Sequence, residues 1–325
     1  MRAIEISEFG EAENLSLIVV TDPEPGPNEV LIEVVAAGVN RADVMQRKGH
    51  YPPPPGTSEL PGLEVSGRIA ALGSEVSGWE VGQEVCALLA GGGYAEKVVV
   101  DASLVLPLPA GVSVQDAAAL PEVVATVYSN LIIEAGLKAG ETVLIHGGSS
   151  GIGTMAIQIA SALGARVAVT AGSDKKLEVC RQLGADITIN YREQDFVESL
   201  LEATDGAGAD VILDVVGAAY LGRNVKALAS AGRIVVIGLL GGAKGELPIG
   251  LLLSKRGRII ATSLRARPLA EKAEIVSAVR EQVWPQIAAG SVRPIIDGHY
   301  PLADATRAHR DLEASQHIGK LLLLM

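Results

Sequence analysis

Short apolar runs alternate with amphipathic segments along the chain from about residue 121 onward. The runs are rich in β-branched residues and predict strands, and each is followed by a turn and a segment with helical spacing. Strands and helices that alternate in this way imply a parallel sheet covered by helices on both faces. The pattern therefore predicts an α/β fold with a doubly wound parallel sheet. The predicted strands cover 141–148, 166–172, 186–191, 209–217 and 233–242.

The first 120 residues have a different pattern, with short apolar runs and no long helical segment between them. Runs at 30–39, 66–73, 84–89 and 96–100 predict strands that glycine and proline separate. A stiff, proline-rich loop extends from Tyr51 to Gly62. This loop is either a rigid surface connection or one wall of a substrate cleft.

The C-terminal segment carries an amphipathic helix at about 269–289, a shorter helix at 303–315 and a last strand. The parallel sheet is complete before this tail, so we expect the tail to return to the first domain. The predicted domains are a catalytic β-rich domain, 1–121 completed by 298–325, and a dinucleotide-binding domain, 122–297.

The chain is acidic, with 27 Lys and Arg against 38 Asp and Glu and a formal net charge of −11. Such a surface repels phosphate backbones and anionic lipids, and aromatic residues make up only 3%, so nucleic-acid binding is not expected. No apolar run has the length of a membrane span and no targeting segment is visible, which favours a cytoplasmic protein. Cys86 and Cys180 are expected to be buried thiols in a reducing compartment.

A glycine-rich turn, GGSSGIG at 147–153, follows the first predicted strand of the parallel sheet and precedes a helical segment. Backbone N–H groups at a helix N-terminus bind phosphate, and glycine lets a pyrophosphate approach closely. The spacing is GxxGxG rather than the standard GxGxxG. The strand–turn–helix context nevertheless indicates a dinucleotide site.

The end of the second strand bears on the choice between NAD and NADP. An NAD site usually carries an acidic residue there for the ribose 2′-hydroxyl, whereas residues 170–173 read Thr-Ala-Gly-Ser. Ser173 and Lys176 offer a hydroxyl and a cation for a 2′-phosphate. Asp174 is an alternative acid, although it also suits a helix cap. The pattern favours NADPH as the cofactor.

A β-rich domain, a central dinucleotide unit and a returning tail resemble the medium-chain dehydrogenase/reductase superfamily. Short-chain dehydrogenases share the glycine turn but need a YxxxK pair, which this chain lacks. The superfamily resemblance implies a GroES-like first domain and a Rossmann second domain. The chain is most similar to the zinc-free NADPH:quinone oxidoreductases, and among them to the p53-inducible branch. The motifs that carry the resemblance are GVNRAD (38–43), PGLEVSG (61–67), GGYAEKVVV (92–100), HIGKLLL (317–323), VNRADVMQRKGHYPPPPG (39–56) and TAGSDKKL (170–177).

The resemblance implies an enzyme without a metal. Zinc-dependent relatives place cysteine and histidine where Asn40 and Leu63 stand, and Glu64 alone does not make a zinc site. The histidines show no ligand spacing, and His309 and His317 are expected on solvated or tail elements.

Three residues are implied as hydrogen-bond donors toward the nicotinamide or the acceptor oxygen: Asn40, Tyr51 and Thr126. Each also has a simpler interpretation. Asn40 could be a turn residue, Tyr51 a cleft wall, and Thr126 a hydroxyl bonded to its own helix. The implied cofactor contacts are Ser150, Gly151, Ile152, Gly172, Ser173, Lys176, Tyr191, Gly217, Gly238, Ser263, Leu264 and Lys320.

Three functions remain open at this point. The first is an NADPH-dependent quinone reductase, the second an NADPH-dependent reductase of α,β-unsaturated carbonyls, and the third a non-catalytic NADPH-binding protein. The apolar segment 246–264 predicts a strand at the edge of the parallel sheet. Two copies paired about a two-fold axis would cover that edge, so a homodimer is expected.

Overall fold

The computed structural model describes residues 1–325, which form two compact units. Unit 1 comprises Met1–Ala125, Leu264–Gly290 and Pro294–Met325, and unit 2 comprises Thr126–Ser263 and Ser291–Arg293. This division differs from the predicted boundaries, which assigned 264–290 to the dinucleotide-binding domain.

Helices α8 (Leu269–Gln282) and α9 (Trp284–Ala288) explain why 264–290 belong to unit 1. Their buried Ile275 and Val279 are part of the apolar interior, and the Trp284 indole donates a hydrogen bond to the Pro107 carbonyl oxygen at 2.8 Å. The prediction of one helix over 269–289 was wrong at Val283, where two helices meet.

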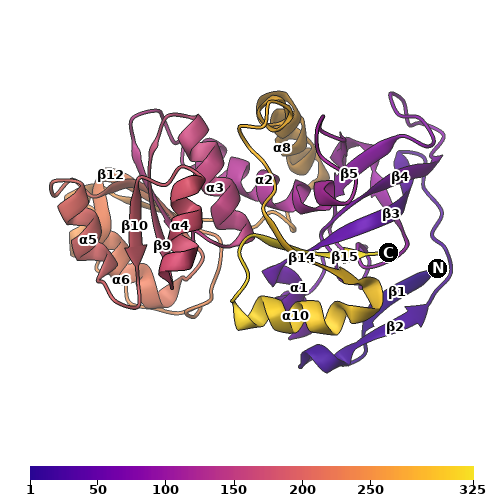
Figure 1. The fold of residues 1–325 in the computed structure, drawn as a ribbon, viewed down its shortest axis with the longest axis horizontal. Coiled ribbons are helices and arrows are strands. Elements are labelled where there is room, and N and C mark those ends of the chain that lie inside the picture. The colour runs from indigo at the N-terminus through magenta and orange to yellow at the C-terminus, as the bar shows by residue number, and fades with distance from the viewer. The chain divides into compact units, whose positions relative to one another are not determined.

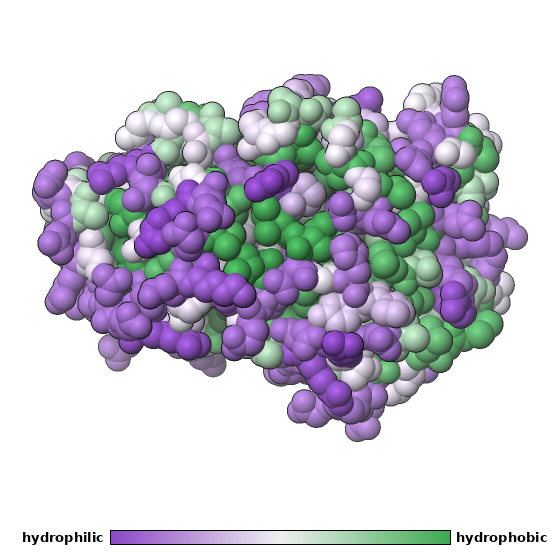
Figure 2. All heavy atoms as spheres, in the orientation of Figure 1, coloured by the Kyte–Doolittle hydropathy of each residue, from purple (hydrophilic) through white to green (hydrophobic).

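Unit 1 is built on a seven-stranded sheet and a separate two-stranded sheet (Figure 1). The order of the large sheet is β14-β15-β3-β4-β5-β7, and β6 also pairs with β3. Figure 2 shows hydrophobic residues on the surface over β1 and β2, where Leu17 and Val19 are exposed. The strands are β1 (Arg2–Ile6), β2 (Leu15–Val19), β3 (Glu29–Val39), β4 (Glu64–Leu72), β5 (Glu84–Leu88), β6 (Lys97–Asp101), β7 (Val105–Pro107), β14 (Ile296–Pro301) and β15 (Lys320–Leu324).

The tail returns to the first sheet, as predicted. Strand β15 pairs antiparallel with β3, and Leu322 lies opposite Gly38. Leu322 also packs with Ala36, Ala118 and Ala119 in a buried cluster. The remaining helical elements of this unit are α1 (Arg41–Arg47), α2 (Pro121–Val127, which ends in unit 2), α10 (Ala305–Ala314) and the 3₁₀ turns η1 (Ala12–Asn14), η2 (Ala102–Leu104), η3 (Asp116–Ala119) and η5 (Leu302–Asp304).

Unit 2 is a six-stranded parallel sheet with the order β10-β9-β8-β11-β12-β13. Its order and direction confirm the predicted doubly wound sheet. The elements are β8 (Thr142–His146), β9 (Arg166–Ala171), β10 (Ile187–Asn190), β11 (Ala209–Asp214), β12 (Leu228–Val236), β13 (Arg258–Ala261), α3 (Gly151–Ala162), α4 (Asp174–Gln182), α5 (Phe196–Ala203), α6 (Ala218–Ala227), α7 (Ile249–Lys255) and η4 (Tyr128–Glu134).

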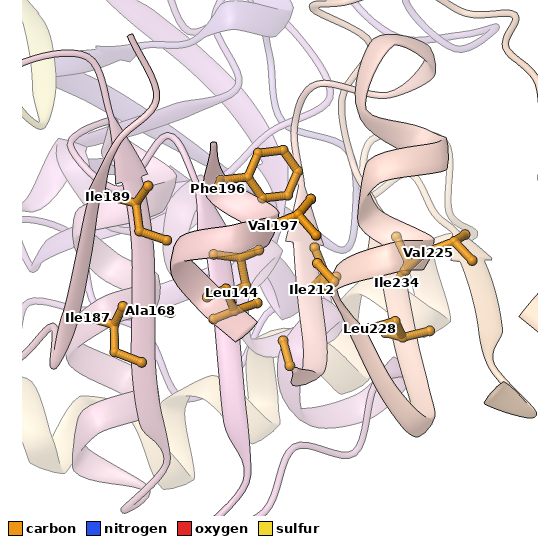
Figure 3. Packing of buried hydrophobic residues seen from close by; sticks show 13 residues of the cluster. Leu144, Ala168, Ile187, Ile189, Phe196, Val197, Ile212, Val225, Leu228 and Ile234 are labelled. Atoms are coloured by element: carbon orange, nitrogen blue, oxygen red, sulfur yellow. The ribbon is translucent and has the colours of Figure 1, made fainter. Parts of the chain in front are cut away.

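Helices α5 and α6 cover one face of the parallel sheet. Phe196 from α5 and Val225 from α6 belong to one buried cluster with Leu144 and Ile212 from the strands (Figure 3). The alternate strand positions are equally buried, Val143 among them. Both faces are therefore covered, which is what strands of almost purely apolar residues require.

Two segments of unit 2 differ from the predicted elements. The apolar stretch 249–255 was expected in an edge strand but is helix α7, so only β13 forms the sheet edge. The helix predicted up to Gly136 changes to a π-helix at Tyr128. The side chains of Ser129 and Asn130 both donate to the Thr126 carbonyl oxygen, at 3.2 and 2.8 Å, and so compete for a backbone acceptor.

Candidate functional site

The glycine-rich turn connects β8 to α3 and has the geometry of a phosphate cradle. Gly147 has φ +71°, and a β-carbon on Gly153 would lie 2.3 Å from the Gly147 carbonyl oxygen. Only glycine therefore lets the helix begin so close to the turn. Ser150 caps α3, because its hydroxyl accepts a hydrogen bond from the Gly153 N–H at 3.0 Å.

Residues 150–152 thus lie together at the N-terminus of α3, as the sequence analysis expected. The N–H groups of the first helical turn have no partner within the helix and carry its positive dipole end. A pyrophosphate fits this turn, since glycine leaves the backbone open at the position where side chains would otherwise stand.

The carboxyl end of β9 gathers the residues predicted for the adenosine end of the cofactor. A β-carbon on Gly172 would lie 2.8 Å from the Tyr191 hydroxyl oxygen and 3.2 Å from Arg192 Nε. Ser173 begins α4, and its side chain makes no capping hydrogen bond. Lys176, in the first turn of α4, is half-buried. These residues present hydroxyls and cations, which are the partners that a 2′-phosphate needs.

Arg192 and Asp174 lie beside the residues that are grouped at the carboxyl end of β9. Arg192 was missed by the sequence analysis, which stopped at Tyr191 although the cation is its next residue. Asp174, the alternative acid, is exposed and receives a long hydrogen bond of 3.4 Å from the Asn190 amide.

Gly217 and Gly238 follow the next two strands along the sheet and lie against one another. Gly217 has φ +79°, and a β-carbon there would be 3.1 Å from the Gly238 carbonyl oxygen. A β-carbon on Gly238 would be 2.7 Å from the Val215 carbonyl oxygen. Both positions therefore need glycine for close backbone packing. Ser263 follows β13, and the next residue, Leu264, is buried.

In unit 1, Asn40 and Lys320 meet at Glu64, whose side chain is fully buried. Lys320 Nζ lies 2.6 Å from a Glu64 carboxylate oxygen and donates to Asn40 Oδ1, also at 2.6 Å. The Asn40 amide donates to the same carboxylate at 2.9 Å, and its second acceptor is the Gly38 carbonyl oxygen at 3.4 Å. Lys320, predicted as a cofactor contact, here holds Glu64 and fixes the orientation of Asn40.

A second buried group supports Asn40 from the other side. Asp43 accepts hydrogen bonds from the Asn40 N–H at 2.7 Å and from the Tyr94 hydroxyl at 3.1 Å. The Tyr94 hydroxyl also contacts His309 Nε2 at 3.0 Å. Burial raises the pKa of Asp43 to about 6 and lowers the pKa of His309 to about 3. His309 lies on a tail element, α10, as one of the two expectations had it, but its ring is buried inside unit 1 with 0% exposure and is not solvated.

Tyr51 begins the proline-rich loop and is held by Arg265, a residue with 4% exposure that the site prediction did not include. The Arg265 guanidinium donates to the Tyr51 carbonyl oxygen at 3.1 Å and to the Ala90 carbonyl oxygen at 2.7 Å. It also donates to Gln46 Oε1 at 2.8 Å, and its central carbon lies 5.4 Å from the centre of the Tyr51 ring. The loop that presents Tyr51 is therefore anchored from two sides.

Family comparisons agree with both units. The alcohol dehydrogenase GroES-like domain model matches residues 26–110, and the zinc-binding dehydrogenase model matches residues 151–280. The quinone oxidoreductase of Rattus norvegicus is 34% identical over 333 residues, which are 100% of this chain and 98% of the relative. The chain belongs to the quinone oxidoreductase family of medium-chain dehydrogenases/reductases.

Solved structures of similar proteins share the fold over the full chain. Escherichia coli quinone oxidoreductase, complexed with NADPH, has a TM-score of 0.91 and 32% identity and covers 100% of both chains. The CurK enoyl reductase has a TM-score of 0.88 and 29% identity and covers 100% of this chain and 99% of its own. The predicted superfamily is therefore confirmed, and the p53-inducible branch stays a prediction.

A zinc site in this quinone oxidoreductase-family chain would need ligands that its side chains do not assemble. No group of three or more His, Cys, Asp or Glu side chains is arranged to hold a metal ion. Leu63 is buried hydrocarbon, and Asn40 is bonded to Glu64 and Lys320. Metal-independent activity remains a prediction, which a chelator tests.

Proposed function

We propose that the protein is an NADPH-dependent, metal-free reductase that transfers hydride from NADPH to a quinone. The observation that carries the cofactor assignment is the grouping of Ser173, Tyr191 and Arg192 around Gly172, with Lys176 on the following turn. The NADPH complex of the E. coli relative supports the same cofactor. The name shared by the full-length relatives supports a quinone as acceptor.

Replacing Lys176 with alanine is expected to weaken the use of NADPH selectively. A charge-assisted contact to the 2′-phosphate contributes about 1.5–3 kcal/mol, so KM for NADPH should rise by roughly ten- to a hundredfold. NADH lacks that phosphate, and its KM should change little. Steady-state kinetics with both cofactors measure the effect, and an equal loss with both would reject the assignment. Lys175→Ala, at the exposed neighbouring position, is the matched control.

The proposed chemistry divides between cofactor and chain. NADPH, when bound, supplies the hydride. The chain orients the acceptor and offers hydrogen-bond donors to the oxygen that gains negative charge. We assign this work to the Tyr51 hydroxyl, the Thr126 hydroxyl and the Asn40 amide. Lys320 and Glu64 hold that amide in one orientation, and we assign to the acceptor the N–H that makes only a long 3.4 Å contact with the Gly38 carbonyl oxygen.

Tyr51→Phe is expected to lower turnover more than it weakens NADPH binding. Losing one donor to the developing oxyanion costs about 1–3 kcal/mol in the transition state, or roughly five- to a hundredfold in kcat. The ring and its position over Arg265 are kept, so the loop should stay in place. Full activity in this variant would show that the Tyr51 hydroxyl is not a donor to the acceptor and that the side chain only lines the site.

Activity that EDTA abolishes and zinc restores would contradict the metal-free mechanism itself.

Reduction of α,β-unsaturated carbonyls is the second candidate, because the full-length structural neighbour CurK is an enoyl reductase. Both acceptor classes take up hydride and place charge on an oxygen, so the same donors serve either. Initial rates of NADPH oxidation with a matched panel of quinones and enones separate them. Higher kcat/KM for the quinones supports the first proposal, and the reverse order supports the second.

A homodimer is a further part of the proposal. Strand β13 is one of the two edge strands of the parallel sheet, and helix α7, which precedes it in the chain, exposes Ile249 at 66% and Leu253 at 74%. Pairing two edges about a two-fold axis would bury these side chains. Sedimentation should show a dimer at micromolar concentration, and Ile249→Lys with Leu253→Lys should shift it toward monomer. A wild-type monomer would rule the dimer out.

We also propose a cytoplasmic location. No helix of the structure combines the length and the apolar character needed to cross a membrane. Both cysteines are buried free thiols, which fits a reducing compartment. Fractionation of cells that express the tagged protein tests this placement.

A further inference from the structure

Four polar side chains are buried beneath the carboxyl edge of the parallel sheet, and none of them is assigned to substrate or cofactor above. They are His146 at the end of β8, Thr170 in β9, Asp214 at the end of β11 and Asn224 in α6, and none is more than 2% exposed. Buried polar groups persist only when their hydrogen bonds are satisfied. Here they satisfy one another.

The protons of the hydrogen bonds among these side chains can be assigned one after another, starting from Asn224. Asn224 donates from Nδ2 to Asp214 Oδ2 at 3.0 Å, so its carbonyl oxygen faces His146 Nε2 at 2.8 Å. His146 must therefore carry its proton on Nε2 and donate. Burial lowers the pKa of His146 to about 4, so the ring is neutral near pH 7 and Nδ1 has no proton.

The bare Nδ1 of His146 must then accept the Thr170 hydroxyl proton across 3.1 Å. Thr170 Oγ1 in turn accepts the Gly147 N–H at 3.3 Å. This series of hydrogen bonds therefore ends at Gly147, the first residue of the phosphate cradle.

The other end lies at the second glycine turn. Asp214 Oδ1 accepts the Val216 N–H at 2.7 Å and the Gly217 N–H at 3.1 Å. Gly217 is the residue whose positive φ lets the backbone turn back against Gly238. A single line of hydrogen bonds thus joins the turn after β8 to the turn after β11. These two strands are neighbours in the sheet, and ligands of such sheets bind at their carboxyl edge.

We propose that Thr170, His146, Asn224 and Asp214 are positioning residues that fix the Gly147 and Gly217 turns for the common part of a nicotinamide dinucleotide. The inference rests on the proposed function only for the identity of that ligand. A preformed pair of turns binds more tightly because less ordering is needed on binding. The hydrogen bonds that these four side chains make run to one another and to the Gly147 and Gly217 turns, so we expect the same effect for NADPH and NADH.

Thr170→Val and Thr170→Ser form the matched test. Valine keeps the shape but removes the hydroxyl, whereas serine keeps the hydroxyl. Dissociation constants for NADPH and NADH are measured by calorimetry without any acceptor. We expect Thr170→Val to raise both constants by the same factor, about tenfold, and Thr170→Ser to stay within about twofold of the wild type.

The outcomes distinguish the two proposals. Wild-type protein that binds neither dinucleotide contradicts the proposed function. Two results would overturn the positioning role of the four residues in protein whose wild type binds. One is an unchanged dissociation constant in Thr170→Val, and the other is weaker binding of NADPH alone. If Thr170→Val does not fold, His146→Phe gives the same test, because a phenyl ring keeps the packing against Phe196 and Tyr220 but has no ring nitrogen. Near wild-type affinity in folded His146→Phe likewise overturns the inference.

Discussion

Replacing Lys320 with methionine is expected to lower the free energy of unfolding by about 3–5 kcal/mol, because it leaves the Glu64 carboxylate buried without its cation. Glu64 has no exposed side-chain surface and lies 2.6 Å from Lys320 Nζ. The carboxylate cannot move away, since the Glu122 N–H and the Asn40 amide both bind it at 2.9 Å.

Urea unfolding at pH 7 measures the effect. Glu64→Gln in the Lys320→Met background removes the stranded charge and should recover part of the loss. Arg68→Met is the control, because it breaks an exposed ion pair with Glu84 and should cost less than about 1 kcal/mol. A Lys320→Met protein within 1 kcal/mol of the wild type would show that the pair is not what holds Asn40 in place.

Lowering the pH from 7 to 5 is expected to reduce the free energy of unfolding by about 2–3 kcal/mol. The folded-state pKa values of His146 and His309 are lowered from 6.5 to about 4 and about 3. The unfolded chain therefore binds these protons first, and stability falls as the pH drops below about 6.5. Each histidine accounts for about 2 kcal/mol of loss by pH 5.

Asp43 acts in the opposite sense. Its pKa is raised from 3.8 to about 6, so the folded state takes up this proton first and gains about 1 kcal/mol by pH 5. Thermal and urea unfolding across pH 5–7 measure the net slope. His309→Gln should make the slope shallower, because it removes one of the two buried rings. A flat profile in the wild type would contradict the assignment of both rings as buried and neutral.

The alternation of strands and helices predicted unit 2, because the spacing of apolar residues within each element shows which of its faces is buried. The glycine turn was equally easy to predict, since a strand, a turn with four glycines and an apolar helix follow one another in the chain. Helix α7 was not, because an apolar run such as 247–253 suits a buried strand as well as a helix. The π-helix occurs where the side chains of Ser129 and Asn130 donate to the Thr126 carbonyl oxygen, and propensity does not reveal which carbonyl a side chain will bind.

The supporting residues of the site were harder to predict than its glycines. His146 finds its partner Asn224 78 residues away, and Arg265 meets Gln46 219 residues away. A buried polar residue is recognisable in a sequence, but its partner follows only from which strand ends meet. Lys320 shows the same limit, since its position in the tail motif was predicted but its bond to Glu64 was not.

The fate of deuterium at C4 of the nicotinamide shows whether hydride passes directly from a cofactor held in one orientation to the quinone. NADPH that carries deuterium in the R or the S position is oxidised by a quinone in the presence of the enzyme and EDTA. Mass spectrometry then measures the deuterium content of the NADP⁺ formed. Direct hydride transfer from a cofactor held in one orientation predicts unlabelled NADP⁺ from one form and fully labelled NADP⁺ from the other. Mixed labelling from both forms, or no quinone-dependent NADP⁺ from enzyme that binds NADPH, would contradict direct hydride transfer from NADPH to the quinone.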